Sequence, residues 1–228
     1  MNGTQHPVFV VVEGLDGVGK TTVVRELAHQ LGAVVLHTPP AEMAELRPAI
    51  LRCFAESMLA TTLFYGATLA AASQRIMAYR AAGRSVVLDR YYLSTCAYGE
   101  VMRGAVHPQQ LLDLLAAQLL PADATVYLHA SIEQRRMRME SRGLFGDEDR
   151  RSLSSDLSER LEAAFRRRAG HPLAGHWLEV DTSACTAEAA VAESIRRLAE
   201  GGFWRPCRLV GRISEPVAAS FVQQGGAL

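Results

Sequence analysis

The chain has 228 residues, of which 49% are hydrophobic, and this is enough to build one α/β domain with a full core. Its formal net charge is zero and only 21% of its residues are charged, which excludes the basic surface of a duplex nucleic-acid-binding protein. The four cysteines form no CxxC pair and the seven histidines show no metal-ligand spacing, which argues against a zinc site or a disulfide scaffold. No apolar stretch reaches the roughly 18 residues that a membrane span requires. We therefore expect a cytoplasmic protein whose partners include neither a membrane nor a nucleic acid polymer.

Five apolar segments, rich in β-branched residues, have the length and character of buried strands. The predicted strands are Val8–Glu13, Ala33–His37, Ser85–Asp89, Thr125–Ala130 and His176–Asp181. Helical patterns separate each strand from the next. Strands that alternate with helices predict a five-stranded parallel, doubly wound α/β sheet flanked by helices.

The helical segments have uneven lengths. A helix over about Gly19–Gln30 follows the first predicted strand, and the long stretch Ala44–Ala82 is expected to hold two helices. Two further predicted helices, Ser131–Glu140 and Leu157–Ala169, flank a polar loop.

The run from Gly14 to Thr21 matches the pattern GxxxxGK[ST] and lies directly between a predicted buried strand and a predicted helix. In this context glycines let successive N–H groups point at phosphate oxygens, while the helix N-terminus adds a positive partial charge. The run therefore predicts a P-loop that binds ATP, and with it the P-loop NTPase fold. The residues assigned to ATP are Gly14, Gly17, Val18, Gly19, Lys20, Thr21 and Thr22. We expect Lys20 to reach the β and γ phosphates and Thr21 to bind Mg²⁺.

Lys20 is the one lysine among 24 basic residues, and the other 23 are arginines. A general preference for arginine explains most of this bias. A compact ammonium on a flexible stem, however, reaches between phosphates where a planar guanidinium does not fit. This geometry makes Lys20 a candidate catalytic residue.

A second group of polar residues follows the third predicted strand, in the run from Asp89 to Tyr98. Parallel sheets bind ligands at the carboxyl ends of their strands, so Asp89 and Arg90 are expected beside the P-loop. Asp89 would orient Mg²⁺ or accept a proton from the acceptor, and Arg90 would bind an acceptor phosphate or the phosphoryl group in transit. The alternative is a structural ion pair at the end of the strand.

Together, the runs Glu13–Thr22 and Asp89–Tyr98 resemble the thymidylate kinase family in both order and spacing. The resemblance extends more loosely from Val8 to Leu198. It implies the nucleoside monophosphate kinase type of P-loop fold, with a mobile lid and a separate acceptor pocket. The segment Thr38–Pro40 is instead similar to the mitochondrial pyrimidine monophosphate kinase branch of the same superfamily.

The resemblance also implies residues that bind the sugar, the phosphate and the base of an acceptor nucleotide. These residues are Asp16, Arg47, Phe64, Arg90, Thr95 and Tyr98. Asp16 would face the sugar, while Arg47 and Arg90 would hold the phosphate. Tyr98 would pack beneath the sugar and disfavour a ribose, and Phe64 would stack on the base.

One position departs from the family. Thr68 stands four residues after Phe64, where the family carries an arginine that reads the edge of thymine. A threonine is too short for that contact. The departure leaves cytosine, a modified pyrimidine or a non-nucleotide phosphate open as the acceptor group.

Three arginines at spacings of three and four share one face of a predicted helix that leads into the polar loop. They are Arg135, Arg138 and Arg142. A loop that closes over the triphosphate would exclude water and bring arginines against the developing charge. The family places a catalytic arginine either in the P-loop or in the lid, and Leu15–Val18 contain none. The lid, at about 141–155, is therefore expected to supply it, with Arg142 as the first candidate and Arg150 or Arg151 next.

We therefore predict ATP- and Mg²⁺-dependent phosphoryl transfer to a (deoxy)pyrimidine nucleoside monophosphate. A kinase domain at residues 1–200 would carry it, followed by an irregular tail at 201–228, rich in glycine and proline. One alternative is a kinase for a modified nucleoside or a natural-product intermediate, motivated by Thr68. Another is a nucleotide-dependent switch protein, which would not need the acceptor residues. Members of the family commonly pair through helices that flank the acceptor pocket, so a homodimer is also implied.

Overall fold

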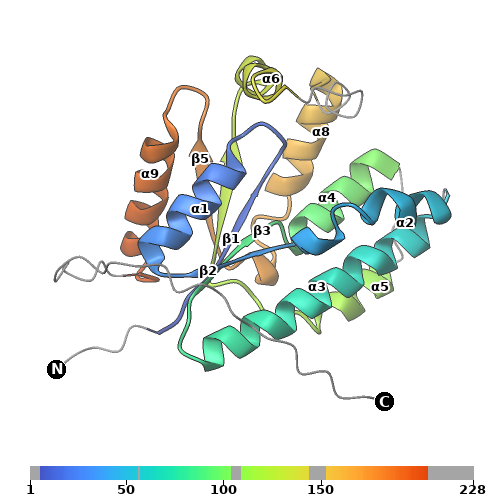
Figure 1. Ribbon diagram of the computed structural model, residues 1–228, viewed down its shortest axis with the longest axis horizontal. Coiled ribbons are helices and arrows are strands. Elements are labelled where there is room, and N and C mark those ends of the chain that lie inside the picture. The colour runs from blue at the N-terminus through green and yellow to red at the C-terminus, as the bar shows by residue number, and fades with distance from the viewer. Residues whose placement is uncertain (1–5, 56, 104–108, 144–152, 205–228) are drawn as a thin grey trace.

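The computed structural model describes residues 6–55, 57–103, 109–143 and 153–204, which form a parallel five-stranded sheet with helices on both faces (Figure 1). The strands are β1 (Phe9–Gly14), β2 (Val34–His37), β3 (Val86–Asp89), β4 (Ala124–His129) and β5 (His176–Asp181). Their order across the sheet is β2-β3-β1-β4-β5. All five strands agree with the sequence prediction, with ends that differ by no more than one residue.

Eight α-helices and two short 3-10 helices connect the strands within the described residues. The α-helices are α1 (Lys20–Leu31), α2 (Arg47–Cys53), α3 (Met58–Ala81), α4 (Tyr92–Arg103), α5 (Gln109–Ala116), α6 (Ile132–Glu140), α8 (Ser155–Arg166) and α9 (Ala187–Glu200). The 3-10 helices are η1 (Ala41–Met43) and η2 (Pro172–Ala174). None of these helices combines the length and apolar character that crossing a bilayer requires.

The stretch Ala44–Ala82 holds two helices, as predicted, because the chain turns between them. Ala55 takes a positive φ of 49°, which an α-helix does not tolerate, and Ser57 then caps the N-terminus of α3 by accepting a hydrogen bond from the Ala60 N–H. The predicted lid and tail lie largely outside the described residues. On the far side of the lid, the helix α8 begins at Ser155 with Ser154 as its N-cap.

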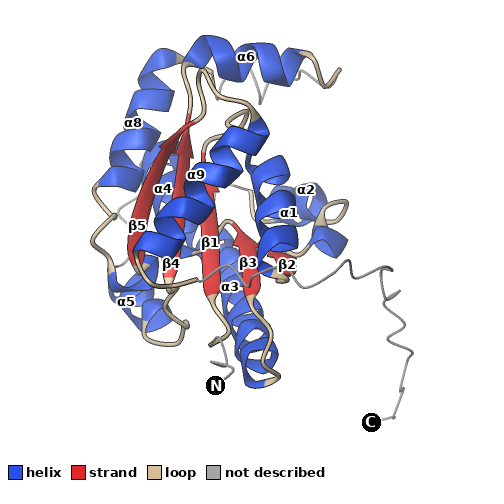
Figure 2. Cartoon of the chain, turned by 90° about the vertical axis from the view of Figure 1, so that its left-hand side faces the viewer, coloured by secondary structure: helices blue, strands red, loops and turns tan. Residues whose placement is uncertain are grey.

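The helices form two layers around the sheet. Helices α1 and α9 pack against each other on one face, while α3, α4 and α8 cover the other (Figure 1). All six residues of β1 are buried, which explains why this central strand is a continuous apolar run apart from Glu13. Figure 2 shows the strands pointing toward the end of the sheet where α6 lies.

The order of the strands determines where ligands can bind. Neighbouring strands β1 and β3 pair with Val12 opposite Asp89, but the chain leaves β1 toward the edge strand β2 and leaves β3 toward β4 on the other side. The connections therefore diverge at the carboxyl ends of β1 and β3, which is the place where doubly wound sheets form a ligand crevice. The P-loop follows β1 and Arg90 follows β3, so the fold brings the two predicted motifs together.

Gly175, which precedes β5, provides a test of this packing. Its φ is +60°, and a Cβ there would lie 2.1 Å from the Ala122 carbonyl oxygen and 2.7 Å from that of Asp123. Gly175→Ala is therefore expected to lower the free energy of unfolding by roughly 2–5 kcal/mol, because the added methyl group forces β4 and β5 apart. Urea denaturation followed by circular dichroism measures the change. Gly170→Ala is the matched control, since a Cβ at Gly170 meets nothing within 4 Å; equal denaturation midpoints for the two variants would contradict the packing described here.

Candidate active site

The P-loop turns between β1 and α1 through three glycines with positive φ. The values are 139° for Gly14, 84° for Gly17 and 95° for Gly19. A Cβ on Gly14 would lie 2.3 Å from the Leu128 carbonyl oxygen, and one on Gly17 would lie 2.9 Å from that of Arg135. The loop therefore requires glycine for its backbone angles, and at two positions also because neighbouring backbone passes so closely.

The N-terminus of α1 is suited to an anion. No side chain caps this helix at Gly19 and its first turn holds no acidic residue, so its N–H donors remain available. The buried side chain of Lys20 lies here, with Nζ donating to the Leu15 carbonyl at 2.7 Å and lying 3.6 Å from the Asp16 carboxylate. Burial, and after it the charge of Arg90, lowers the pKa of Lys20 to about 8. A polyanion placed here would find both backbone donors and a cation.

Three consecutive carbonyl oxygens of the P-loop accept hydrogen bonds from side chains outside it. Arg135 Nε donates to Asp16 at 2.7 Å, Arg138 Nη1 to Gly17 at 3.4 Å and Thr182 Oγ1 to Val18 at 2.9 Å. Arg138 also donates to the Thr182 carbonyl at 2.5 Å, so two of these three donor residues are linked to each other. Helix α6 and the segment after β5 thus hold the P-loop from its outer side.

The two sequence motifs meet in an ion pair between Asp16 and Arg90. Arg90 Nη2 lies 2.5 Å from Asp16 Oδ1, and the guanidinium stacks over the ring of Tyr98 with 5.2 Å to the ring centroid. Burial disfavours the Asp16 carboxylate, yet Arg90 and Lys20 hold its pKa well below the usual range. Arg90 takes a positive φ of 66°, which is uncommon for a residue with a side chain and typical of functional sites.

Glu13 holds this unusual backbone in place. Its fully buried carboxylate accepts hydrogen bonds from the backbone N–H groups of Tyr91 at 2.9 Å and Ser94 at 3.2 Å, and from the Ser94 hydroxyl at 2.5 Å. Burial raises the pKa of Glu13, and these donors partly offset that effect. Because Tyr91 directly precedes α4 and Ser94 lies in its first turn, one carboxylate from β1 positions the backbone at the start of that helix.

Asp89 and Thr21 present oxygen atoms of the kind that Mg²⁺ prefers. Asp89 Oδ1 is buried with no hydrogen-bond partner among the described residues, while Oδ2 lies 3.6 Å from His37 Nδ1. Burial opposes ionisation of Asp89, but His37 and Lys20 lower its pKa, so that it is a carboxylate at neutral pH. Thr21 is exposed at the start of α1. The buried Asp89 carboxylate oxygen, which has no partner among the described residues, and the exposed Thr21 side chain in the first turn of α1 are the kinds of ligand that fit a magnesium ion.

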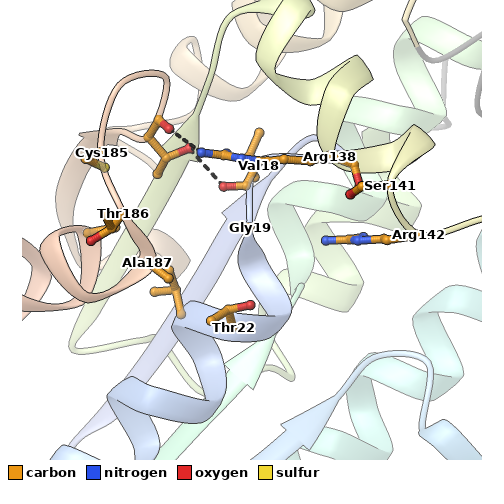
Figure 3. Close-up of a pocket in the computed structure, with 12 residues that line it drawn as sticks. Val18, Gly19, Thr22, Arg138, Ser141, Arg142, Cys185, Thr186 and Ala187 are labelled. Atoms are coloured by element: carbon orange, nitrogen blue, oxygen red, sulfur yellow. Dashed lines mark hydrogen bonds between the residues drawn. The ribbon is translucent and has the colours of Figure 1, made fainter.

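A cleft of about 250 Å³ lies beside the P-loop, between α6 and the start of α9 (Figure 3). Its lining residues are Val18, Gly19, Thr22, Val23, Arg138, Ser141, Arg142, Thr182, Cys185, Thr186, Ala187 and Ala190. Figure 3 shows Arg142 reaching into the cleft from the end of α6, on the side opposite Thr186 and Ala187. The mixture of small apolar residues with hydroxyl and guanidinium groups suits a flat heterocycle attached to a phosphate chain.

The predicted acceptor residues on α3 lie in an aromatic group. The ring of Phe64 contacts those of Phe54 and Tyr65, with centroid separations of 6.1 and 5.2 Å. Thr68 is buried, and its hydroxyl donates to the Tyr65 carbonyl at 2.8 Å within the same helix. The Thr68 hydroxyl is thus engaged by its own backbone.

Two further predicted acceptor residues lie on α2 and α4. Arg47 is exposed at the first residue of α2, and Thr95 is half-buried on α4 one turn before Tyr98. No hydrogen bond or ion pair joins Arg47 to the Asp16–Arg90 pair within the described residues. Arg150 and Arg151 lie outside the described residues.

Several residues of the site were not predicted from the sequence. Arg135 and Arg138 were predicted only to share a helix face that leads into the lid. They hold P-loop carbonyls, and Arg135 is buried, while Arg138 also lines the cleft. Glu13 and His37 had no assigned role. A lone acidic residue inside the apolar run of β1 was a usable signal for Glu13, whereas nothing local to His37 indicates that β2 places it opposite Asp89.

Comparisons with known proteins agree with this geometry. The family model described as thymidylate kinase matches residues 12–186. The thymidylate kinase of Cereibacter sphaeroides is 33% identical over 205 residues, which cover 78% of this chain and 93% of that protein. The thymidylate kinase of Ruegeria pomeroyi is 31% identical over 176 residues, covering 72% of this chain and 82% of its own length.

A solved structure of thymidylate kinase from Candida albicans has the same fold. It superimposes with a TM-score of 0.67 at 22% identity, and the match covers 87% of this chain and 93% of that one. The family model spans the P-loop, the Asp89–Arg90 turn and the segment after β5. This chain therefore belongs to the thymidylate kinase family of nucleoside monophosphate kinases.

Proposed function

We propose that the protein transfers the terminal phosphoryl group of ATP to dTMP or a closely related deoxypyrimidine monophosphate. The observation that carries this proposal is the direct contact between the two halves of the site. Asp16 belongs to the P-loop and Arg90 to the turn after β3, yet their side chains form one ion pair beneath which Tyr98 stacks. A protein that only hydrolysed ATP or signalled its presence would have no need for the second half.

On the donor side, the triphosphate would lie along the P-loop with Lys20 between its outer phosphates, and the adenine would occupy the cleft next to Thr182. Thr21 and Asp89 would hold Mg²⁺, which would offset charge on the β and γ phosphates during transfer. Arg142, which follows the end of α6 and lines the cleft, would provide a further positive charge as the lid at about 141–155 closes.

On the acceptor side, Arg90 and Arg47 would hold the phosphate, and Asp16 would accept a hydrogen bond from the sugar. Tyr98 would pack beneath the deoxyribose, where a 2′-hydroxyl would lose its hydration without gaining a partner. Phe64 would stack on the base, with Thr95 at the wall of the pocket. The role of these residues is to align the acceptor phosphate with the γ phosphate and to exclude water that competes for it.

A coupled assay of ADP formation with a panel of nucleotides tests the proposal. Purified protein with MgATP is expected to turn over with dTMP, and more slowly with dUMP and dCMP, because the pocket discriminates by shape where no arginine reads the base. Ribonucleotides such as UMP should react least. An absence of ADP release with every pyrimidine monophosphate would exclude the proposed activity.

Replacement of the lone lysine gives a second prediction. Lys20→Arg keeps the positive charge but replaces a compact ammonium with a planar guanidinium that needs more room. The Lys20 Nζ lies 2.7 Å from the Leu15 carbonyl oxygen, and the side chain is almost fully buried, so little room is available. We expect kcat/KM for ATP to fall by roughly 10²–10³-fold, as for loss of one preorganised charge contact. Steady-state kinetics with ATP as the varied substrate measures it. Turnover close to the unsubstituted enzyme would show that the ammonium geometry is unimportant.

We also propose that two copies of the chain pair through α3. Three large apolar side chains of this helix, Leu59, Leu63 and Met77, are each about half exposed, and their spacing places them on one stripe of the helix surface. An identical stripe on a second copy would cover it through a two-fold contact.

Sedimentation velocity tests the pairing. The unsubstituted chain is expected to sediment as a dimer, and Leu63→Glu as a monomer, because a buried unpaired carboxylate costs several kcal/mol in such a contact. Met137→Glu is the matched control, since Met137 is equally exposed but lies on α6. If both substitutions dissociate the dimer, or if neither does, the contact does not lie on α3 alone, and the proposed pairing is contradicted.

A further inference from the structure

Arg135 is a buried arginine that no step of the proposed reaction uses. It is 1% exposed, although it lies on a helix whose neighbouring Arg136 is open to solvent. Its Nε donates to the Asp16 carbonyl at 2.7 Å and its Nη1 to the Ser158 hydroxyl of α8 at 2.9 Å. The side chain therefore links α6 and α8 to the backbone of the P-loop.

The direction of the Asp16 carbonyl determines the direction of the next N–H group. In a planar trans peptide the C=O of one residue and the N–H of the next point to opposite sides. Because Arg135 holds the Asp16 carbonyl toward α6, the Gly17 N–H points the other way, into the loop. Arg138 and Thr182 act on the next two peptides in the same manner, so that three successive N–H donors face inward together.

Arg135 is also the donor closest to the acceptor half of the site. The peptide that it holds belongs to Asp16, whose carboxylate contacts Arg90 at 2.5 Å and lies 3.6 Å from Lys20. A rotation of this peptide would therefore displace the Gly17 donor and the Asp16 carboxylate at once. The P-loop has little room to adjust, because Gly17 packs directly on the backbone of Arg135.

We propose that Arg135 is a positioning residue for phosphoryl transfer: by holding the Asp16 carbonyl it aims the Gly17 N–H at the triphosphate and the Asp16 side chain at Arg90. The proposal rests on the P-loop being the ATP site of the function proposed above. Arg135 itself touches neither substrate, and its charge acts on the reaction only through the orientation of this peptide.

Affinity for ATP, measured by isothermal titration calorimetry with MgATP and no acceptor, tests the proposal. For Arg135→Ala we expect the dissociation constant to rise at least about tenfold, as a preorganised donor is lost from the loop. Arg136→Ala, the same change at the adjacent exposed position, is expected to alter it by no more than about twofold. A purely structural role would lower the melting temperature of Arg135→Ala but leave its ATP affinity, measured well below that temperature, equal to that of Arg136→Ala. That result would overturn the proposal.

Two further variants keep the test decisive if Arg135→Ala does not fold. Arg135→Lys retains the charge but cannot donate in two fixed directions, so its ATP affinity is expected to fall by about threefold or more. Ser158→Ala leaves the bond to Asp16 intact and should stay within about twofold of the unsubstituted protein. Equal ATP affinity in Arg135→Lys and Ser158→Ala would contradict the proposal. Since ATP binding is measured without an acceptor, a failure of dTMP to react would refute the proposed function and leave this result unaffected.

Discussion

The ion pair between Asp16 and Arg90 is the contact on which the organisation of the site depends. It joins a residue of the P-loop to a residue that leaves the neighbouring strand, 74 positions later in the chain. Neither partner could reach the other if β1 and β3 were not adjacent and parallel with their carboxyl ends level. Several features stabilise the pair from outside: Glu13 fixes the backbone around Arg90, Tyr98 supports the guanidinium, and Arg135 holds the peptide of Asp16.

This arrangement separates the electrostatic tasks of the site. The buried carboxylate of Glu13 and the half-exposed carboxylate of Asp16 accept hydrogen bonds from groups whose positions matter, while the cations Lys20 and Arg90 both lie close to Asp16. Because burial makes each uncompensated charge costly, the charges occur in contact with one another and resist rearrangement. A preorganised set of this kind is what phosphoryl transfer requires, since the protein contributes mainly alignment and charge stabilisation.

Much of the fold could be predicted from the sequence, because its signals are local. Apolar β-branched runs indicated all five strands, and the glycine pattern with Lys20 and Thr21 indicated the P-loop between a strand and a helix. The Asp89–Arg90 turn was found because strand ends of a parallel sheet share one edge. The functions of Arg135 and Arg138 could not be found in this way. Their helical spacing correctly indicated one shared face, but which way that face points depends on the packing of α6 against a loop about 120 residues earlier.

The hydrogen bond from Thr182 to the Val18 carbonyl has a consequence for the synthesis of the protein. Its two residues are 164 positions apart, so the loop that follows β1 is held by a residue that follows β5. At ribosomal rates of roughly 5–20 residues per second, Val18 emerges on the order of 10–30 s before Thr182 exists. For most of that interval Arg135 and Arg138 have not been made either, so the outer carbonyls of the P-loop lack all three of their donors. The P-loop is thus made before the residues that hold its outer carbonyl oxygens.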